Sequence, residues 1–562
     1  MRSRRLYALF GLVATLFGMA VGHLTAALLN PDSSPVLAVG SSVIDLTPVS
    51  VKEWAIRNFE SDGFSIGPFD FAARNYDKVV LVGSVLVGVL VLAAIAGVLA
   101  RRSFAIGGGM LAALVLVAGV AVLTRPTVTA LDVVPVLLTL VAGVGGLWWL
   151  HCSAQGRSLD PRARSTVEVA KAEGAAGTTG TTGTTGSTAD DEYVIQGEGA
   201  RSATASKPSR RGVLIATGVL AGAAAVFGGL GRFIIGKRAE PEDVALPDPA
   251  PGESAPPLPR DLSKTIPGIT PLVIANSEFY RVDTRLDTPV VGSEDWTLTV
   301  DGDVENKLTI TFDELLEMPM IERDITLTCV SNTVGGKYVG GARWLGVPLK
   351  TVLDMAGVGG GADQILSTDF DGMTISTPLD LATDGRDAMI CVGMNGEPLP
   401  RAHGFPVRLV IPGLYGFISA TKWLTKLTLT TYAEQEAYWT ERKWDTRAPI
   451  KPSARIDTPR GSDKLDGAKV VFGGVAWAQN DDGAKTVQVS IDGGAWKDAK
   501  LGPDVNNVYW RQWYFEASDL ESGQHNVSAR VKSGDGKTQT DAIAAPFPGG
   551  ASGIHSLLFN VA

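Results

Sequence analysis

The sequence predicts a transmembrane region of five helices at the N-terminus, then a mixed α+β domain, and then a C-terminal β-sandwich of the immunoglobulin type. Composition predicts the membrane region, because 45% of the 562 residues are hydrophobic, only 19% are charged and the mean hydropathy is +0.15. Uncharged apolar runs longer than the ~18 residues that can cross a bilayer occur only in the first half of the chain. In the second half, strand patterns first interleave with short helices and then continue alone.

Five apolar runs predict the membrane-spanning helices. Four of them lie in the predicted four-helix region 1–150, and the fifth occupies the segment 212–236. The runs are 6–29, 79–100, 104–124, 128–150 and 212–235. An alternative for the first run is a cleaved signal peptide, since it follows the basic start Met-Arg-Ser-Arg-Arg, but its length favours a span.

Basic residues indicate which side of the membrane each segment occupies. They gather at 2–5, 101–102, 157–171 and 207–211, and an N-terminus inside the cell places all four groups in the cytoplasm. After five spans, everything beyond about residue 237 then lies outside. We therefore expect a multi-pass protein of the cell membrane with an extracytoplasmic second half.

Two polar segments flank the fifth predicted span. Residues 151–211 contain GTTGTTGTTG, whose Gly and Thr bury little surface, so a flexible cytoplasmic linker is expected there. Residues 237–262 are rich in proline and in acidic residues, and they predict a tether.

Twin arginines at 210–211 precede the fifth apolar run. This arrangement is typical either of a Tat export signal or of ordinary positive-inside flanking.

The second half divides into two predicted domains. In residues 263–446, WTLTVDG alternates like a half-buried strand, and Thr311 with Glu314 forms the capping box that begins a short helix. Residues 447–562 show strands only, with a Gly-Gly hairpin turn in VSIDGGAW. That spacing predicts an immunoglobulin-like sandwich.

Charge and rare residues exclude several classes of protein. The net charge of -9 and the lack of a dense basic cluster argue against nucleic-acid binding. Three cysteines are too few for a disulfide scaffold. We predict no haem, because a membrane haem with two axial histidines needs both in helices and only His23 lies within an expected span.

Cys329 is the candidate metal ligand. It ends the predicted strand 324–329, where a side chain can point into a pocket, and polar residues follow it. A thiolate is a soft ligand that suits a transition metal such as molybdenum, and one cysteine can anchor a metal whose other ligands come from an organic cofactor. The alternative is a buried structural thiol, which Cys391 fits better.

A second group of polar residues lies in RAHGFPVRLVIPGLYGFISATKWL. His403 and Arg408 flank a Gly-Phe-Pro turn, and Lys422 follows a glycine-containing loop that also holds Ser419 and Thr421. Two cations, an imidazole and hydroxyls around flexible backbone predict a binding site for a cofactor phosphate. The alternative is a polar turn with exposed charges.

Taken together, the segments of the second half resemble the sulfite oxidase family of molybdopterin enzymes. The resemblance covers about residues 265–562 and leaves out the first four spans. Its combination of a cysteine with HGFPVR and KWL is highly specific. In the order expected for the family, the segments read NSEFYRVDT, WTLTVDG, TLTCVSN, GGARWLGVPLKTVL, MNGEPLPRAHGFPVRLVIPGLYG, TKWL, AWA, VSIDGGAW, WRQW and GGASGIHSL.

The resemblance implies a molybdenum atom held by the dithiolene of one molybdopterin and by the thiolate of Cys329. It implies two-electron oxygen-atom transfer at molybdenum, with Arg281 and Trp444 as catalytic residues beside the metal. Residues 447–562 would form a dimerisation-type domain and give a homodimer. The residues implied to contact the pterin are Asn276, Tyr280, Thr368, His403, Arg408, Ser419, Thr421 and Lys422, together with Cys329.

The sequence departs from the sulfite-oxidising members at the substrate side. Those members have FYVRNH where this chain has FYRVDT, so Arg281 is offset, and they have a tyrosine where this chain has Trp444. Sulfite is a dianion that needs clustered arginines, for which Arg281, Arg343 and Arg511 are the candidates. Reduction of an S-oxide such as methionine sulfoxide is therefore a second hypothesis. A third is a cofactor-free binding or sensor module that keeps the fold.

The electron partner follows from the same resemblance. The chain has no cytochrome b5-like segment with paired His-Pro-Gly-Gly motifs, so we expect a separate quinone or cytochrome partner and a small-molecule substrate. The first four helices would then serve as an anchor or docking unit. The resemblance also favours the Tat interpretation of the twin arginines, because a pterin made in the cytoplasm must be buried in a folded domain before export.

Overall fold

The computed structural model describes residues 3–48, 51, 64–66, 69–71, 76–125, 129–155, 210–238, 242, 244–285, 288–460, 464–466 and 469–562. The chain divides into a helical unit, Met1–Thr47 with Asp77–Lys237, and a second unit, Pro48–Tyr76 with Arg238–Ala562. Most of the predicted linker 151–211 lies outside the described residues.

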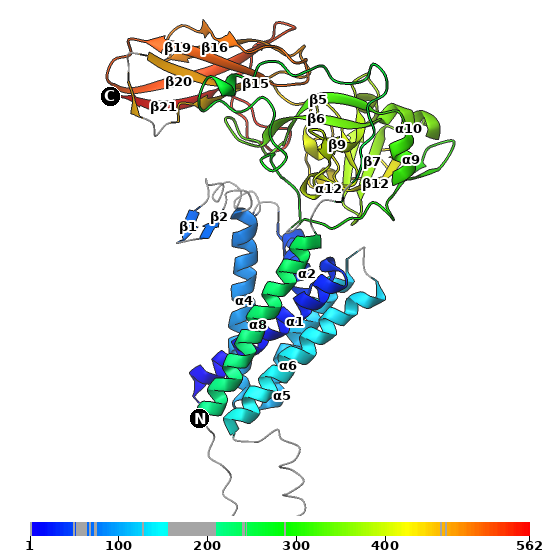
Figure 1. The fold of residues 1–562 in the computed structure, drawn as a ribbon, viewed down its shortest axis with the longest axis vertical. Coiled ribbons are helices and arrows are strands. Elements are labelled where there is room, and N and C mark those ends of the chain that lie inside the picture. The colour runs from blue at the N-terminus through cyan, green and yellow to red at the C-terminus, as the bar shows by residue number, and fades with distance from the viewer. Residues whose placement is uncertain are drawn as a thin grey trace, which may run out of the picture. The chain divides into compact units, whose positions relative to one another are not determined.

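Among the described residues, the helical unit contains five helices that are long and apolar enough to cross a membrane, which agrees with the five predicted apolar runs (Figure 1). A short helix, α2, was not predicted. The elements before residue 239 are α1 (Arg4–Leu28), η1 (Pro31–Ser33), α2 (Pro35–Leu46), β1 (Phe64–Ile66), β2 (Phe69–Phe71), α4 (Tyr76–Ala100), α5 (Phe104–Leu123), η3 (Ala130–Asp132), α6 (Val133–Gln155) and α8 (Arg210–Arg238).

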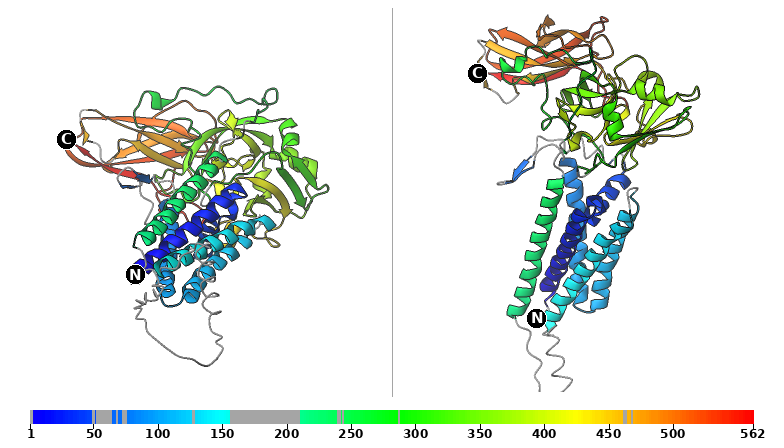
Figure 2. Two further views of the ribbon diagram at one scale, coloured as in Figure 1. Left: turned by 60° about the horizontal axis from the view of Figure 1, so that its bottom comes forward. Right: turned by 45° about the vertical axis from the view of Figure 1, so that its right-hand side comes forward.

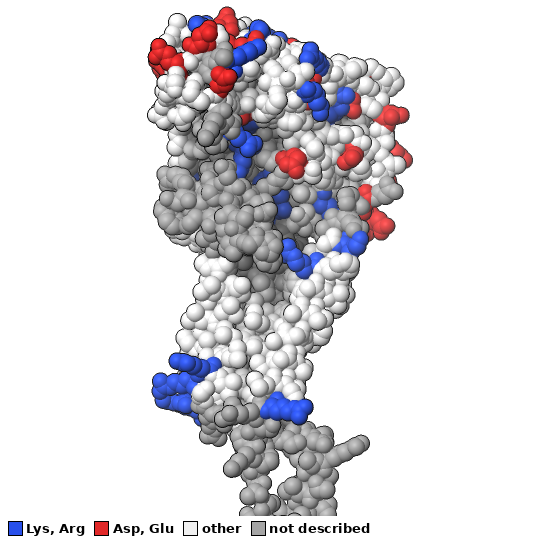
Figure 3. Space-filling model, turned by 60° about the vertical axis from the view of Figure 1, so that its left-hand side comes forward, with Lys and Arg blue, Asp and Glu red and all other residues white. Residues whose placement is uncertain are grey.

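Small residues let these helices pack closely. A Cβ atom at Gly11 of α1 would lie 1.9 Å from the carbonyl oxygen of Ala93 in α4, so only glycine permits this approach of the two backbones. Figure 3 shows that uncharged atoms form most of the visible bundle surface, and that basic side chains lie near its lower and upper ends. This surface is the kind that a bilayer requires.

The expectation that only His23 lies within a span is wrong. His151 lies in the last turns of α6, because that helix continues to Gln155 beyond the apolar run that ends at residue 150. The hydroxyl of Tyr7 in α1 is 3.3 Å from His151 Nδ1, and this buried contact ties the two helices together.

The α+β domain is built on two five-stranded sheets. The first has the strand order β10-β9-β6-β5, with β11 paired to β9, and the second has the order β4-β3-β12-β7-β8. The strands are β3 (Thr297–Gly302), β4 (Leu308–Thr311), β5 (Ile321–Thr328), β6 (Val339–Pro348), β7 (Gln364–Asp369), β8 (Thr374–Pro378), β9 (Met389–Met394), β10 (Glu397–Pro398), β11 (Arg408–Val410) and β12 (Leu424–Thr430).

Short helices connect these strands. They are η4 (Leu262–Lys264), α9 (Phe312–Glu317), α10 (Leu349–Ala356), α11 (Leu379–Ala382), η5 (Arg401–His403), η6 (Gly416–Ile418) and α12 (Tyr438–Glu441). The predicted capping box is present, since Thr311 accepts a hydrogen bond from the Glu314 N–H while the Glu314 carboxylate accepts one from the Thr311 N–H. Leu298, Val347 and Leu427 belong to the buried core that both sheets share.

The C-terminal domain is a sandwich of two sheets, as the strand pattern predicts (Figure 2). One sheet has the order β13-β15-β19-β18 and the other β14-β21-β20-β16-β17, and Phe472 of β15 meets Phe559 of β21 in their common core. The strands are β13 (Ser453–Thr458), β14 (Lys464–Leu465), β15 (Lys469–Trp477), β16 (Ala484–Ile491), β17 (Lys497–Asp498), β18 (Lys500–Leu501), β19 (Arg511–Ser518), β20 (Gly523–Ser533) and β21 (His555–Val561).

The sandwich also completes the edge of the first sheet of the α+β domain. β5 is the terminal strand of that sheet, and its residue Thr326 donates its N–H to Val508 O at 3.1 Å and accepts the Trp510 N–H on its hydroxyl at 2.9 Å. The side chain of Gln479 donates to Thr326 O at 2.7 Å. Hydrogen bonds from the C-terminal domain therefore fix β5, the strand that leads to Cys329.

Thr326→Val should lower the free energy of unfolding by about 1–3 kcal/mol, because it leaves the buried Trp510 N–H without an acceptor. Chemical denaturation of the detergent-solubilised chain, followed by tryptophan fluorescence, measures this change. Thr309→Val, at an exposed position of β4, is the matched control and should change stability by less than about 0.5 kcal/mol. Equal effects of the two substitutions would contradict the role of the Thr326 hydroxyl.

Candidate functional site

Cys329 lies directly after β5, at the start of the loop 329–338 that connects β5 to β6. The backbone N–H of Cys329 donates to Tyr338 O at 2.9 Å, which closes the base of this loop. The thiol is 9% exposed, and its Sγ lies 2.8 Å from the hydroxyl oxygen of Ser331. The cysteine thus stands at a sheet edge, at the point where the backbone turns away.

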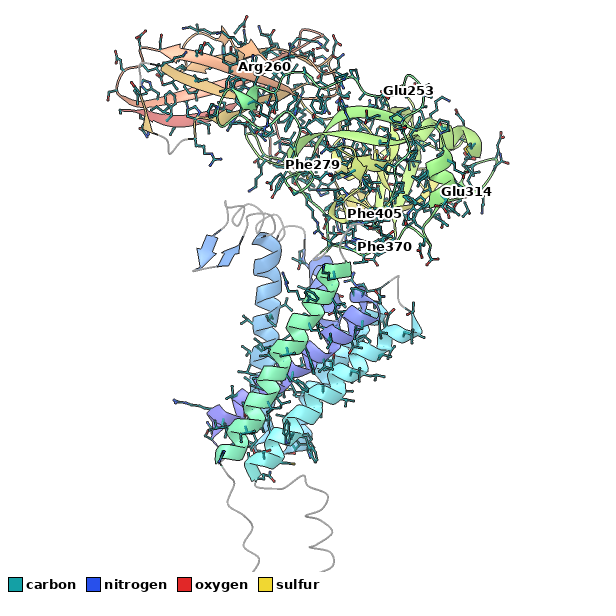
Figure 4. All side chains as sticks on the ribbon, viewed as in Figure 1. Glu253, Arg260, Phe279, Glu314, Phe370 and Phe405 are labelled. Atoms are coloured by element: carbon teal, nitrogen blue, oxygen red, sulfur yellow. The ribbon has the colours of Figure 1, made fainter. Side chains whose placement is uncertain are left out.

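His403 is buried and held in one orientation. It ends the short helix η5, and its Nε2 lies 3.0 Å from the carbonyl oxygen of Asn276. Because a carbonyl can only accept, Nε2 carries the proton. Burial and the nearby charge of Arg408 lower the pKa of His403 to about 3, so the imidazole is neutral near pH 7. Phe279, labelled in Figure 4, meets this ring edge-on at 5.5 Å.

Arg408 is a buried cation that has no carboxylate partner among the described residues. It begins β11 and donates to the carbonyl oxygens of His403 at 3.0 Å and Ala420 at 3.4 Å, while its Nε has no hydrogen-bond partner. Its guanidinium lies 5.0 Å from the centre of the Trp344 ring. Burial lowers the pKa of Arg408 to about 10. A buried charge in this state is costly unless an anion accompanies it, so the position suits a phosphate.

Lys422 and Arg281 share one carboxylate. Lys422 Nζ donates to Asp283 Oδ2 at 2.6 Å, and Arg281 Nε donates to the same oxygen at 2.7 Å. Arg281 also donates to the hydroxyl of Thr288 at 2.8 Å. Burial lowers the pKa of Lys422 to about 8, although Asp283 opposes this change. Asp283 was not singled out from the sequence, since an isolated Asp in a loop carries no motif.

Tyr280 connects Cys329 to the cationic group. Burial raises the pKa of its hydroxyl, a negative charge at Cys329 adds to this increase, and the positive charge of Arg408 opposes it. The Tyr280 ring stacks on Phe279 at 5.1 Å and approaches Tyr338, at the end of the Cys329 loop, at 6.4 Å. The structure therefore gathers Cys329, Tyr280, Arg408 and His403 in one region.

The amide of Asn276 is occupied by neighbouring protein groups. It donates to Met394 O at 3.2 Å and to Glu397 at 3.1 Å, and it accepts from Asn395 at 2.8 Å. Its main-chain oxygen, by contrast, is the partner of His403. Any contact of Asn276 with a cofactor stays a prediction, and the structure gives the residue a role in orienting the imidazole.

The three predicted hydroxyl residues lie near the start of β12 and in its partner β7. Thr421 Oγ1 is 2.6 Å from the hydroxyl of Ser367, and the Ser419 hydroxyl contacts the carbonyl oxygens of Leu414 and Tyr415 at 2.9 and 3.0 Å. Thr368 lies in β7 and accepts a hydrogen bond on its carbonyl oxygen from Thr425. These contacts fix the loop before Lys422, and direct pterin contacts stay predictions.

Trp444 lies in a cluster of aromatic rings. Its ring is 5.6 Å from Phe417, 5.9 Å from Trp439 and 5.2 Å from Phe547, which comes from the C-terminal domain. Tyr415 lies two residues before Phe417. Burial raises the pKa of its hydroxyl to about 12, and a negative charge at Cys329 adds to this increase. The sequence analysis did not name Tyr415 as a site residue.

The other two candidate substrate arginines are engaged elsewhere. Arg343 makes a two-pronged contact with Asp324 at 2.9 and 2.8 Å. Arg511 donates to Gly502 O at 2.8 Å and lies 3.5 Å from the carboxylate of Asp504. Neither contact brings an arginine to Cys329.

Arg285 was missed by the sequence analysis. It forms ion pairs with Asp369 at 2.8 Å and Asp371 at 2.7 Å, and its guanidinium lies 4.4 Å from the Phe370 ring centre and 5.5 Å from that of Trp423. These contacts fix the residue that follows Lys422. The available signal was the unusual density of charges in RVDTRLDT.

Comparison with known proteins identifies the domain that carries these residues. Residues 285–439 match the oxidoreductase molybdopterin binding domain. The chain is 28% identical over 329 residues to mitochondrial sulfite oxidase of Homo sapiens, which covers 49% of this chain and 59% of that protein. It is 32% identical over 216 residues to NADH nitrate reductase of Solanum lycopersicum, covering 34% of this chain and 23% of that protein.

Among solved structures, the sulfane dehydrogenase SoxCD from Paracoccus pantotrophus is similar at 20% identity with a TM-score of 0.45, covering 52% of this chain and 83% of that one. The chain spans about 59% of the length of the human sulfite oxidase that it matches. Cys329, His403, Arg408 and Lys422 all lie within the segment that matches the molybdopterin binding domain.

Arg408→Met should lower the molybdenum and pterin content of the purified protein about tenfold or more, because a charge-assisted phosphate contact in a buried site contributes on the order of 1.5–3 kcal/mol. Metal analysis and pterin fluorescence after denaturation measure both contents. Arg323→Met, which breaks ion pairs to Glu253 and Asp387 far along the sheet edge, is the control and should leave both unchanged. Full cofactor content in Arg408→Met would exclude the phosphate role.

Inorganic phosphate should stabilise the cofactor-free protein more at about pH 7.5 than at about pH 9.5. Lys422 has a pKa of about 8, so it is charged below that pH and loses its proton, and its attraction for an anion, above it. The phosphate-induced rise in unfolding temperature measures the effect. Lys422→Arg keeps its charge at both pH values, so its pH dependence should be clearly smaller; an unchanged dependence would show that another group titrates.

Proposed function

We propose that this chain, a molybdopterin oxidoreductase of the sulfite oxidase family, is a membrane-anchored enzyme that performs two-electron oxygen-atom transfer on the extracytoplasmic side of the membrane. The observation that carries the proposal is the buried charge of Arg408 beside His403, because the Arg408 Nε has no hydrogen-bond partner. The His403 ring meets Phe279, which stacks on Tyr280, and the Tyr280 ring approaches Tyr338 at the end of the Cys329 loop. A cofactor that carries both a metal and a phosphate would match this region, with the metal at Cys329 and the phosphate at Arg408.

The residues present fit molybdopterin. Cys329 offers one thiolate, and Arg408 and Lys422 offer buried positive charge to an anion. His403 is neutral and offers hydrogen-bonding capacity without further charge. When bound, molybdopterin supplies the dithiolene sulfurs and the molybdenum that takes up two electrons. The protein residues bind the phosphate, exclude water by burial and fix the position of the thiol.

Reduction of an S-oxide is the second candidate function. The candidate arginines Arg281, Arg343 and Arg511 each contact an acidic residue in the structure, so they do not form the cluster that a sulfite dianion needs. Trp444 stands where sulfite-oxidising members of the family have a tyrosine, and its ring contacts Phe417 and Phe547. A neutral S-oxide fits these surroundings better than a dianion, whereas the sequence similarity to sulfite oxidases favours sulfite.

Membrane attachment gives the enzyme its place in the cell. Five helices are long and apolar enough to span a bilayer, and the basic groups of the sequence favour an extracytoplasmic second half. Export of the folded domain by the Tat route, an immunoglobulin-type C-terminal domain that forms a homodimer, and electron exchange with a quinone or cytochrome belong to the same proposal. The proposal also divides the second half into a molybdopterin domain at 263–446 and a C-terminal domain at 447–562.

Cys329→Ser should reduce turnover about 100-fold or more, because an oxygen ligand is harder than a thiolate and changes the metal's charge and potential. Sulfite oxidation with an artificial acceptor and sulfoxide reduction with a reduced dye, assayed side by side, also decide the substrate. Cys152→Ala, in the helical unit, is the control and should keep full activity. A wild-type protein matured in a molybdenum-competent host that contains neither molybdenum nor pterin would instead indicate a cofactor-free binding or sensor module.

A further inference from the structure

Hydrogen bonds close the loop 329–338 at its base, and one further bond, from Gly336 N–H to Thr333 O at 2.9 Å, lies nearer its tip. Cys329 N–H donates to Tyr338 O, and the Tyr338 N–H donates to the side-chain oxygen of Asn332 at 2.8 Å. Asn332 N–H in turn donates to Cys329 O at 3.0 Å. The tip of the loop is Val-Gly-Gly, which has no large polar side chain of its own to anchor it.

Two residues of the C-terminal sandwich contact this tip. Arg455 of β13 donates from its Nη1 to Gly336 O at 3.0 Å. His555, the first residue of β21, packs against Gly335, where a Cβ atom would lie 2.3 Å from His555 Nε2. Gly335 has φ +79°, so both its backbone conformation and its contact with the imidazole require glycine.

Arg455 is itself fixed at every nitrogen. Its Nε donates to Asp457 at 2.6 Å and its Nη2 donates to the hydroxyl of Thr270 at 2.8 Å. Asp457 also accepts the Thr270 N–H at 3.0 Å. The arginine is 8% exposed, so this network is shielded from water, and its hydrogen bonds hold the guanidinium in a single place.

His555 is fixed as well. Its Nδ1 lies 2.9 Å from the backbone nitrogen of Ile456, which can only donate, so Nδ1 accepts and the ring proton lies on Nε2, facing Gly335. Burial and the charge of Arg455 lower the pKa of His555 to about 4, which keeps the ring neutral near pH 7. The imidazole is therefore a rigid, uncharged surface for the loop.

We propose that Arg455 and His555 are positioning residues that hold the Cys329 loop in place, so that the C-terminal sandwich is part of the metal-binding site and not only a dimerisation domain. The proposal rests on the proposed function as far as the metal is concerned. Its geometric part, the immobilisation of the loop and of the Cys329 thiol, holds for the cofactor-free chain too.

Arg455→Lys tests the proposal, because lysine keeps the positive charge but cannot contact Asp457, Thr270 and Gly336 at once. In the full chain from a host that makes no molybdopterin, alkylation of Cys329, followed by peptide mass spectrometry, should become about tenfold faster as the loop opens more often. In the loaded enzyme, kcat should fall with little change in KM, and the molybdenum(V) electron paramagnetic resonance signal should shift or broaden.

Arg530→Lys is the matched control, since Arg530 lies in β20 of the same sandwich and contacts Gln488 and Trp496 away from the loop. It should leave alkylation and the resonance signal as in the wild type. His555→Asn, which keeps an acceptor for the Ile456 N–H, is the second variant and should act in the same direction as Arg455→Lys. Near-ultraviolet circular dichroism verifies that each variant is folded.

Unchanged Cys329 alkylation, or an unchanged resonance signal, in folded Arg455→Lys and His555→Asn would overturn the proposal. If the wild-type protein carries no molybdenum, the proposed function fails, and the alkylation rates alone then decide whether the sandwich holds the loop. The two failures are thus distinguishable.

Discussion

The structure depends on one electrostatic constraint, the burial of Arg408 without a carboxylate partner among the described residues. A guanidinium removed from water costs free energy that two carbonyl oxygens and the Trp344 ring offset only in part. The surrounding residues do not supply the missing anion: His403 is neutral, and the nearby Asp283 is already shared by Lys422 and Arg281. The phosphate-bearing cofactor proposed above would supply this anion, and its binding would then stabilise the folded domain.

The second organising feature is the position of Cys329 at the meeting point of two domains. β5 delivers the cysteine from the α+β domain, while the edge of that strand pairs with the segment around Val508 and Trp510 of the sandwich. Arg455 and His555 then contact the tip of the loop that follows. The cysteine is thus held on both sides by hydrogen bonds between parts of the chain that are over 100 residues apart in sequence. Such support limits the movement of the thiol that we propose as the metal ligand.

The residues that the sequence proposed for the substrate side have partners within the protein. Arg281, Arg343 and Arg511 contact acidic groups, and Trp444 lies among aromatic rings from both domains. Because each arginine already has an anionic partner, its attraction for a further anion is reduced. The arginines are therefore held by acidic groups of the protein, and Trp444 is held by ring contacts.

The sequence by itself determined the elements whose signal is local: the apolar spans, the capping box at Thr311, the strands of the sandwich and the Cys329 motif with HGFPVR and KWL. These follow from hydropathy, periodicity and side-chain type over a few neighbouring residues. It missed the extension of α6 to His151, because that helix continues past the apolar run that signals it. It also missed α2, because 12 residues are fewer than the ~18 that signal a span. Only the tertiary structure decided that Asp283 joins Lys422 to Arg281 and that Arg455 reaches the Cys329 loop, since these contacts join residues that are far apart in the sequence and leave no periodic pattern in it.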